Sequence, residues 1–70
     1  MTKTLEELSR DYFNAANILT QRIHERNEKL KLLAPASNKA ERLKREIRAL
    51  YYERAETTQI AMKLATYYEN

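Results

Sequence analysis

Five basic side chains that follow the only proline, Pro35, are the residues best suited to bind an anionic ligand. They lie at the start of a predicted helix, where phosphate groups would meet both the cations and the free amides of the first turn. The same spacing also fits a solvated helix face, because glutamates three or four positions away pair with such cations. Nucleic-acid or anion contact is therefore an alternative function here. The five residues are Lys39, Arg42, Lys44, Arg45 and Arg48.

No arrangement of residues predicts catalysis or a cofactor site. The chain has no cysteine and one histidine, so a metal site would need a cluster of carboxylates, and the spacing of the acidic residues predicts none. Glycine is absent, which excludes a glycine-rich phosphate loop, and no nucleophile stands beside a base. We expect a protein that is not an enzyme and that uses neither a cofactor nor a metal.

The spacing of the apolar residues predicts two helices. On each side of Pro35 they recur in alternating steps of three and four, and the second series mirrors the first. Partners such as Leu30 with Leu43, and Ile23 with Leu50, have residue numbers that add up to roughly 73, as antiparallel helices require. The sequence therefore predicts an all-α fold, in which a single domain over residues 1–70 forms an antiparallel, coiled-coil-like helical hairpin.

Local signals set the ends of the two helices. Thr4 and Glu7 form a capping box, in which each side chain accepts from the other residue's backbone amide. Asn38 and Glu41 form a second one, and Pro35 disfavours a helical conformation at the residue before it. We expect the first helix at about 4–33, the loop at 34–38 and the second helix at about 38–68.

Two arginines, Arg26 and Arg54, occupy positions on the predicted seam between the helices. A buried guanidinium needs a partner, which glutamates at the margin of the seam or on a second chain would supply. Such a polar layer can fix the register or the oligomeric state, or the two side chains can extend to the edge of the seam. Tyr51 and Tyr68 also face the seam, and we expect both in the core.

Several large apolar residues fall outside the predicted seam. Phe13 and Ile18 lie on opposite sides of it, and Tyr52 points almost directly away from it. Most of these residues are in the half of the hairpin that carries both chain termini. A single seam cannot cover them, so we expect a partner or dimer surface. Its members are Phe13, Ile18, Tyr52, Ile60, Leu64 and Tyr67.

The charge divides the hairpin in the same way. Residues 22–48 carry nine basic side chains and four glutamates, a net charge of +5, and the rest of the chain has a net charge of −2. An antiparallel dimer would set each basic loop end beside the acidic end of the other copy. Because two helices bury only one stripe each, small chains of this kind commonly associate. We expect a homodimer that forms a four-helix bundle.

The remaining predictions concern location and function. No apolar run approaches the ~20 residues that span a bilayer, and acidic residues stand near the start, where a signal peptide would be apolar. We expect a cytoplasmic protein without membrane contact. The predicted function is that of a protein–protein interaction or oligomerisation module, with itself or another protein as partner. The alternative is a small nucleic-acid-binding regulator that uses the basic loop end.

Overall fold

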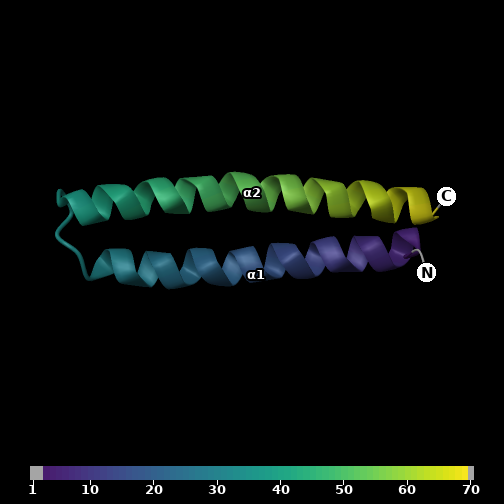
Figure 1. Ribbon diagram of the computed structural model, residues 1–70, viewed down its shortest axis with the longest axis horizontal. Helices are drawn as coiled ribbons and strands as arrows, with labels where there is room; N and C mark the ends of the chain where they lie inside the picture. The colour runs from purple at the N-terminus through teal and green to yellow at the C-terminus, as the bar shows by residue number, and fades with distance from the viewer. Residues whose placement is uncertain (1–2, 70) are drawn as a thin grey trace.

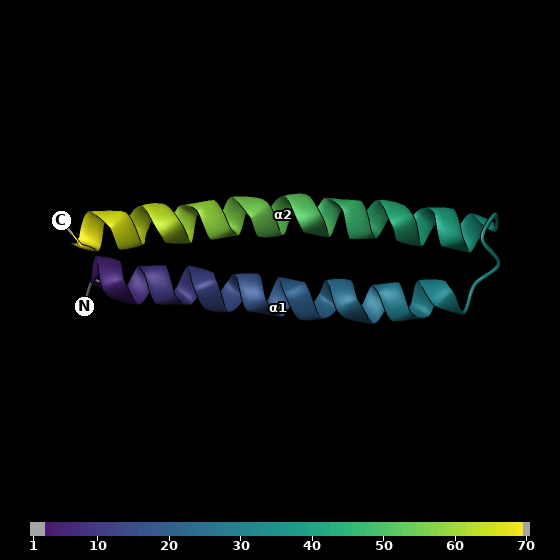
Figure 2. The same cartoon turned by 180° about the vertical axis from the view of Figure 1, so that it is seen from behind.

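The protein is a long hairpin of two helices (Figure 1). The computed structural model describes residues 3–69, with side chains for residues 3–67. Helix α1 spans Leu5–Lys31 and helix α2 spans Asn38–Glu69. The start of α1 and the end of α2 lie together, opposite the connection between the helices, as Figure 2 shows from behind. The molecule measures 50 × 17 × 16 Å, and the predicted all-α hairpin is confirmed.

Helix α1 begins where the sequence predicts and ends two residues early. Thr4 is extended, and its hydroxyl accepts a hydrogen bond of 3.1 Å from the amide of Glu7. The last helical residue is Lys31, and the amide of Leu32 donates to the carbonyl three residues back at 3.0 Å. This tighter turn ends the helix before Pro35, which disfavours a helical residue just ahead of it.

Helix α2 is capped by Ser37. The Ser37 hydroxyl accepts from the amide of Ala40 at 3.1 Å, which satisfies a donor that the first turn leaves free. The predicted cap at Asn38 is wrong, because Asn38 is already the first helical residue. The amide of Ser37 also donates to the carbonyl of Ala34 at 3.0 Å. This bond closes a turn around Pro35 and places Ser37 one residue before the helix.

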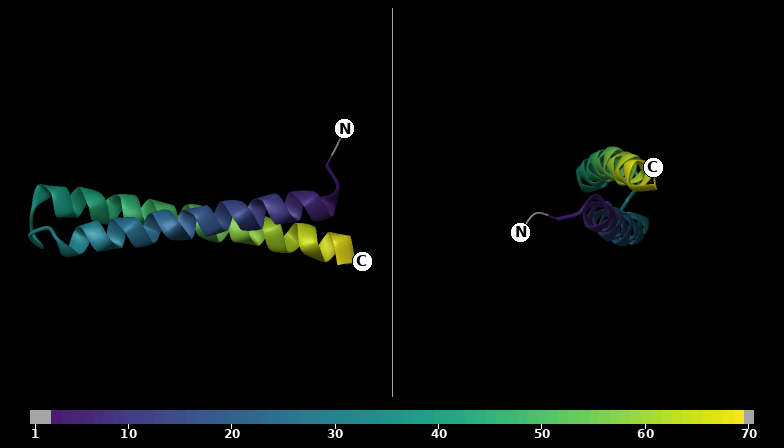
Figure 3. Two further views of the ribbon diagram at one scale, coloured as in Figure 1. Left: turned by 90° about the horizontal axis from the view of Figure 1, so that it is seen from below. Right: turned by 90° about the vertical axis from the view of Figure 1, so that its right-hand side faces the viewer.

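The core is the single seam between the helices, which run side by side along their whole length (Figure 3). Its buried residues recur at the three- and four-residue steps of one helix face. No large side chain among the described residues is completely removed from solvent. The buried residues are Ser9, Ala16, Leu19 and Ile23 in α1, and Ala40, Ile47 and Ala61 in α2.

Polar contacts across the seam confirm the predicted register. They join Ser9 Oγ to the Ala61 carbonyl at 3.1 Å, Arg54 Nη1 to Thr20 Oγ1 at 3.3 Å, and Arg26 Nε to Glu46 Oε2 at 3.4 Å. The residue numbers of each pair add up to roughly 73, the value expected for this antiparallel pairing.

Ser9 is a core residue that the sequence analysis did not identify. It is buried, and its hydroxyl donates to a backbone carbonyl of α2. Its position carries a signal, because Ser9, Ala16 and Ile23 follow one another at steps of seven, the repeat of a helical seam. Leu8, the residue before it, is only half-buried. A small hydroxyl side chain lets the two helices approach closely at this level.

Tyr51 does not lie in the core, so that expectation is wrong. Its side chain is 45% exposed, because its neighbour Leu50 takes the place nearer the seam. The guanidinium of Arg54 lies over the Tyr51 ring, 4.9 Å from its centroid. Leu5 is also exposed, at the open end of the hairpin. The side chain of Tyr68 lies outside the described residues.

Candidate partner surface

One side of the hairpin carries a shallow groove between α1 and α2. The first stretch of the groove is lined by Arg26, Glu46, Ala49 and Leu50, and the second by Ala15, Ile18, Leu19, Arg22, Glu53 and Thr57. Arg22 and Arg26 are four residues apart, and Leu50 and Glu53 are three apart. Because such neighbours share one side of a helix, both stretches open on the same side of the molecule.

The same side continues toward the chain termini. From Thr57, helix α2 places Ile60, Leu64 and Tyr67 at further steps of three and four. Ile60 is 41% exposed and Ile18, the middle residue of α1, is 50% exposed. Leu64 is half-buried and Tyr67 is exposed. We call the groove-lining residues, together with Ile60, Leu64 and Tyr67, the groove face.

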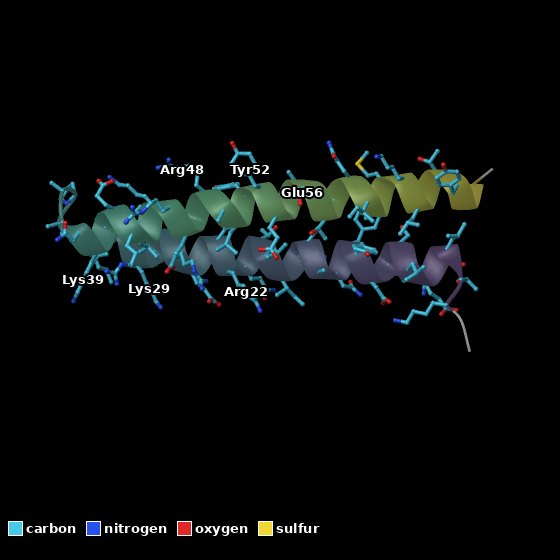
Figure 4. The ribbon with its side chains drawn as sticks, turned by 45° about the horizontal axis from the view of Figure 1, so that its top comes forward. Arg22, Lys29, Lys39, Arg48, Tyr52 and Glu56 are labelled. Atoms are coloured by element: carbon cyan, nitrogen blue, oxygen red, sulfur yellow. The ribbon has the colours of Figure 1, made fainter. Side chains whose placement is uncertain are left out.

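The six residues predicted as a partner surface do not form one patch. Ile18, Ile60, Leu64 and Tyr67 share the groove face. Phe13 precedes Ile18 by five residues, about 140° around the helix, and is exposed on the other side of the seam. Tyr52 projects from the edge of α2 that is turned away from α1 (Figure 4). The groove face therefore holds four of the six, and Phe13 and Tyr52 lie elsewhere.

The five basic residues of the loop end do not point in one direction. Lys44 is half-buried, and its Nζ lies 3.3 Å from Glu41 and 3.4 Å from the Pro35 carbonyl. In Figure 4, Arg48 projects from the outer edge of α2, whereas Lys39 projects toward the opposite side of the molecule. These cations surround the loop end instead of lining a single cleft.

Four of these cations have no ionic partner. Among the side chains that the structure describes, no acidic group lies within ion-pair distance of Lys39, Arg42, Arg45 or Arg48, and all four are exposed. The three arginines follow one another at steps of three along the first half of α2. The combination leaves three guanidinium groups on one stretch of helix available to an anion.

The two seam arginines find partners within the chain. Arg26 pairs with Glu46 at 3.4 Å on the groove face, and its side chain is 33% exposed. Arg54 donates to Thr20 and covers the ring of Tyr51. Both guanidinium groups thus reach the edges of the seam. The sequence indicated glutamates at the seam margin or on a second chain as partners. Within the chain, Glu46 at the margin pairs with Arg26, and Arg54 contacts no glutamate among the described side chains.

Acidic residues extend the α1 edge of the groove face at its other end. Asp11 lies seven residues before Ile18, and Glu7 lies four before Asp11, so helical spacing aligns all three. Asp11 pairs with Lys3, and this hydrogen-bonded contact raises the pKa of the Lys3 ammonium. Near the loop, the hydrogen bond from Lys31 lowers the pKa of the Glu28 carboxyl. Both ion pairs are exposed.

Within residues 3–67, no three histidine, aspartate or glutamate side chains come close enough together to bind a metal ion. Over the described range, neither helix carries an apolar stretch that would cross a bilayer. No family model, curated protein or solved structure matches this chain.

Proposed function

We propose that this protein is a non-enzymatic interaction and oligomerisation module, a helical hairpin that pairs with a second copy to form a four-helix bundle. One observation carries the proposal. In the half that holds the termini, the buried residues are the small Ser9, Ala16 and Ala61, while Ile18 and Ile60 remain 50% and 41% exposed. Large apolar side chains on one continuous face are typical of a surface that binds another protein.

The total surface area supports a dimer. The hairpin exposes 5825 Å², whereas a compact monomer of this size exposes about 4,600 Å². Two hairpins packed into one compact bundle would together bury roughly 4,000 Å². Stable homodimers bury about 2,000–5,000 Å² in total. The area that two hairpins would bury on forming a compact bundle falls within this range.

The proposal is tested by sedimentation equilibrium of the full chain and of an Ile18→Ser/Ile60→Ser variant. We expect the wild type to be dimeric at tens of micromolar. The four half-exposed isoleucines of a dimer contribute about 1 kcal/mol each, so the variant should dimerise about a thousandfold more weakly. Tyr52→Ser, on the outer edge of α2, is the matched control and should dimerise as the wild type does.

Two results would overturn the proposal. One is a wild type that stays monomeric at tens of micromolar. The other is an Ile18→Ser/Ile60→Ser variant that keeps its helical circular dichroism and dimerises with the affinity of the wild type.

A second candidate function is that of a small nucleic-acid-binding regulator. It is supported by Arg42, Arg45 and Arg48, three of the four loop-end cations that have no ionic partner among the described side chains. Anisotropy of labelled duplex and hairpin RNA and DNA, measured over a salt series, should show an affinity that falls steeply with salt. A variant with all three arginines changed to glutamine should bind more weakly, and absence of binding by the wild type at low salt would eliminate this candidate.

A further inference from the structure

Two tyrosines and two arginines lie together along the outer edge of α2. Arg48 precedes Tyr51 by three residues and Tyr52 by four, so its side chain lies one turn from both rings. Arg45 lies one further turn toward the loop. Tyr51 is 45% exposed, Tyr52 is 72% exposed, and both arginines are exposed. We call these four residues the tyrosine patch.

The two rings of the patch are held in different ways. The guanidinium of Arg54 lies over the Tyr51 ring, 4.9 Å from its centroid, and donates to Thr20 Oγ1 of α1 at 3.3 Å. These contacts order the Tyr51 ring, and binding to an ordered group costs less conformational entropy. Tyr52 projects from the outer edge of α2, away from α1 (Figure 4). One ordered ring and one uncovered ring are thus available to stack on a planar group.

The tyrosine patch is positively charged. Among the side chains that the structure describes, no carboxylate lies within ion-pair distance of Arg45 or Arg48. Glu46 and Glu53 are close to the patch in the sequence, but both line the groove between the helices. Two guanidinium groups beside exposed aromatic rings are therefore available to an anion.

Acidic residues limit the length of the patch. On the same edge of α2, Glu41 lies four residues before Arg45, and Glu56 lies four residues after Tyr52. The distance along the helix axis from Arg45 to Tyr52 is about 10 Å, since each residue adds about 1.5 Å. Stacked nucleotides are about 3.4 Å apart, so the patch matches the length of about three of them.

We infer that the tyrosine patch binds single-stranded nucleic acid, with unpaired bases stacked on the tyrosine rings and phosphates held by the arginines. Single-strand sites in general combine these two elements, cations along the backbone and aromatic side chains against the bases. The inference rests on the second candidate function and adds the form of the nucleic acid and the residues that bind it. A second copy on the groove face would leave Arg48 and Tyr52 free, because both project from the outer edge of α2 (Figure 4).

A duplex fits the patch less well than a single strand does. Bases in a duplex are stacked on one another, so their faces are not open to a tyrosine ring. A helix that enters the major groove also has a phosphate backbone on each side. The side of α2 that carries Arg42 also carries Glu46 and Glu53, and carboxylates repel phosphate groups. A single strand can follow the patch alone and avoid both glutamates.

Anisotropy of a labelled single strand of about twelve nucleotides tests the stacking. Tyr52→Leu keeps an apolar side chain but removes the ring, and we expect it to weaken binding by about tenfold. Tyr67→Leu is the matched control, because Tyr67 is also 72% exposed but lies on the groove face near the chain termini. It should bind as tightly as the wild type. Both variants should keep the helical circular dichroism, since both side chains are exposed.

The salt dependence of the affinity tests the arginines. Each phosphate contact adds about 0.7 to the slope of log affinity against log salt concentration, so Arg45→Gln/Arg48→Gln should reduce the slope by about 1.4. Lys29→Gln is the matched control, because Lys29 is an exposed cation near the loop that projects to the opposite side of the molecule from Arg48 (Figure 4). It should leave the slope unchanged. Tyr52→Leu should also leave it unchanged, because stacking on a base releases no counterions.

The outcomes separate the inference from the second candidate function. A wild type that binds neither the single strand nor a duplex at low salt overturns both. If the wild type binds nucleic acid but Tyr52→Leu binds as tightly, the inference is overturned and the candidate function stands. Tighter binding to a duplex of the same sequence than to the single strand has the same meaning. Weaker binding by Tyr52→Leu at an unchanged salt slope, with a reduced slope for Arg45→Gln/Arg48→Gln, establishes the tyrosine patch as a single-strand site.

Discussion

The two halves of the hairpin follow the same helical repeat but place their large apolar side chains differently. The loop half comprises residues 19–54, and the terminal half comprises residues 3–18 and 55–69. In the loop half, the seam buries the large Leu19, Ile23 and Ile47, with one small residue, Ala40, next to the loop. In the terminal half it buries Ser9, Ala16 and Ala61 and leaves most of the large apolar residues on the outer flanks. Six of the nine exposed large apolar side chains belong to the terminal half.

The difference shows how side-chain size at the seam decides what a pair of helices does with its apolar residues. Where the seam positions are large, the side chains fill the space between the helices and the flanks are free to carry charge. Where the seam positions are small, the backbones approach closely and large neighbours are displaced to the outside. The loop half packs on itself, and we propose that the terminal half packs against a partner.

The largest expected effect comes from emptying the loop-half seam. Ile23 is only 3% exposed, so Ile23→Ala should lower the free energy of unfolding by about 2–5 kcal/mol. Urea unfolding followed by helical circular dichroism at a fixed protein concentration measures this loss. Tyr52→Ala, at an exposed position of the same half, should stay within about 0.5 kcal/mol of the wild type. A loss below about 1 kcal/mol for Ile23→Ala would show that the loop half does not depend on its seam.

A smaller effect is expected when the terminal-half seam is overfilled. Ala61 is fully buried beside Ser9, so the extra volume of Ala61→Leu must push the two backbones apart. We expect a loss of about 1–3 kcal/mol in the same urea experiment. Ala55→Leu, at an exposed site on α2, is the control and should change stability by less than about 0.5 kcal/mol. If Ala61→Leu were more stable than the wild type, the two helices could not lie as close together at Ala61 as we infer.

The smallest effects compare the caps of the two halves. Ser37 is half-buried and caps α2, and its replacement by alanine should cost about 1 kcal/mol. Thr4 caps α1 at the exposed, open end, where fraying reduces the effect, so Thr4→Ala should cost less. Thermal unfolding by circular dichroism ranks the two. Asn38→Ala serves as the control. If it lowered the stability as much as Ser37→Ala does, Asn38 and not Ser37 would be the residue that caps α2.

Much of the fold could be predicted from the sequence, because helical periodicity is a local signal. The repeat around Pro35 predicts the hairpin and its register, as the contact between Arg26 and Glu46 confirms. The sequence could not predict which of two adjacent residues takes a given position when both are suited to it. Ser37 and Asn38 are both good caps, and the turn around Pro35 decides between them. Similarly, Leu50 and Tyr51 are adjacent candidates for the seam, and only packing selects Leu50.

The sequence by itself determines the antiparallel hairpin, its charge division and the surplus of apolar residues near the termini, since each follows from the order of residues along a helix. Only the tertiary structure decides which of those residues form one surface. Ile18, Ile60, Leu64 and Tyr67 come together on the groove face, whereas Phe13 and Tyr52 do not. The physical reason is that a shared surface depends on how two helices are rotated against each other. Small buried residues such as Ser9 and Ala61 set that rotation through contacts between residues far apart in the chain.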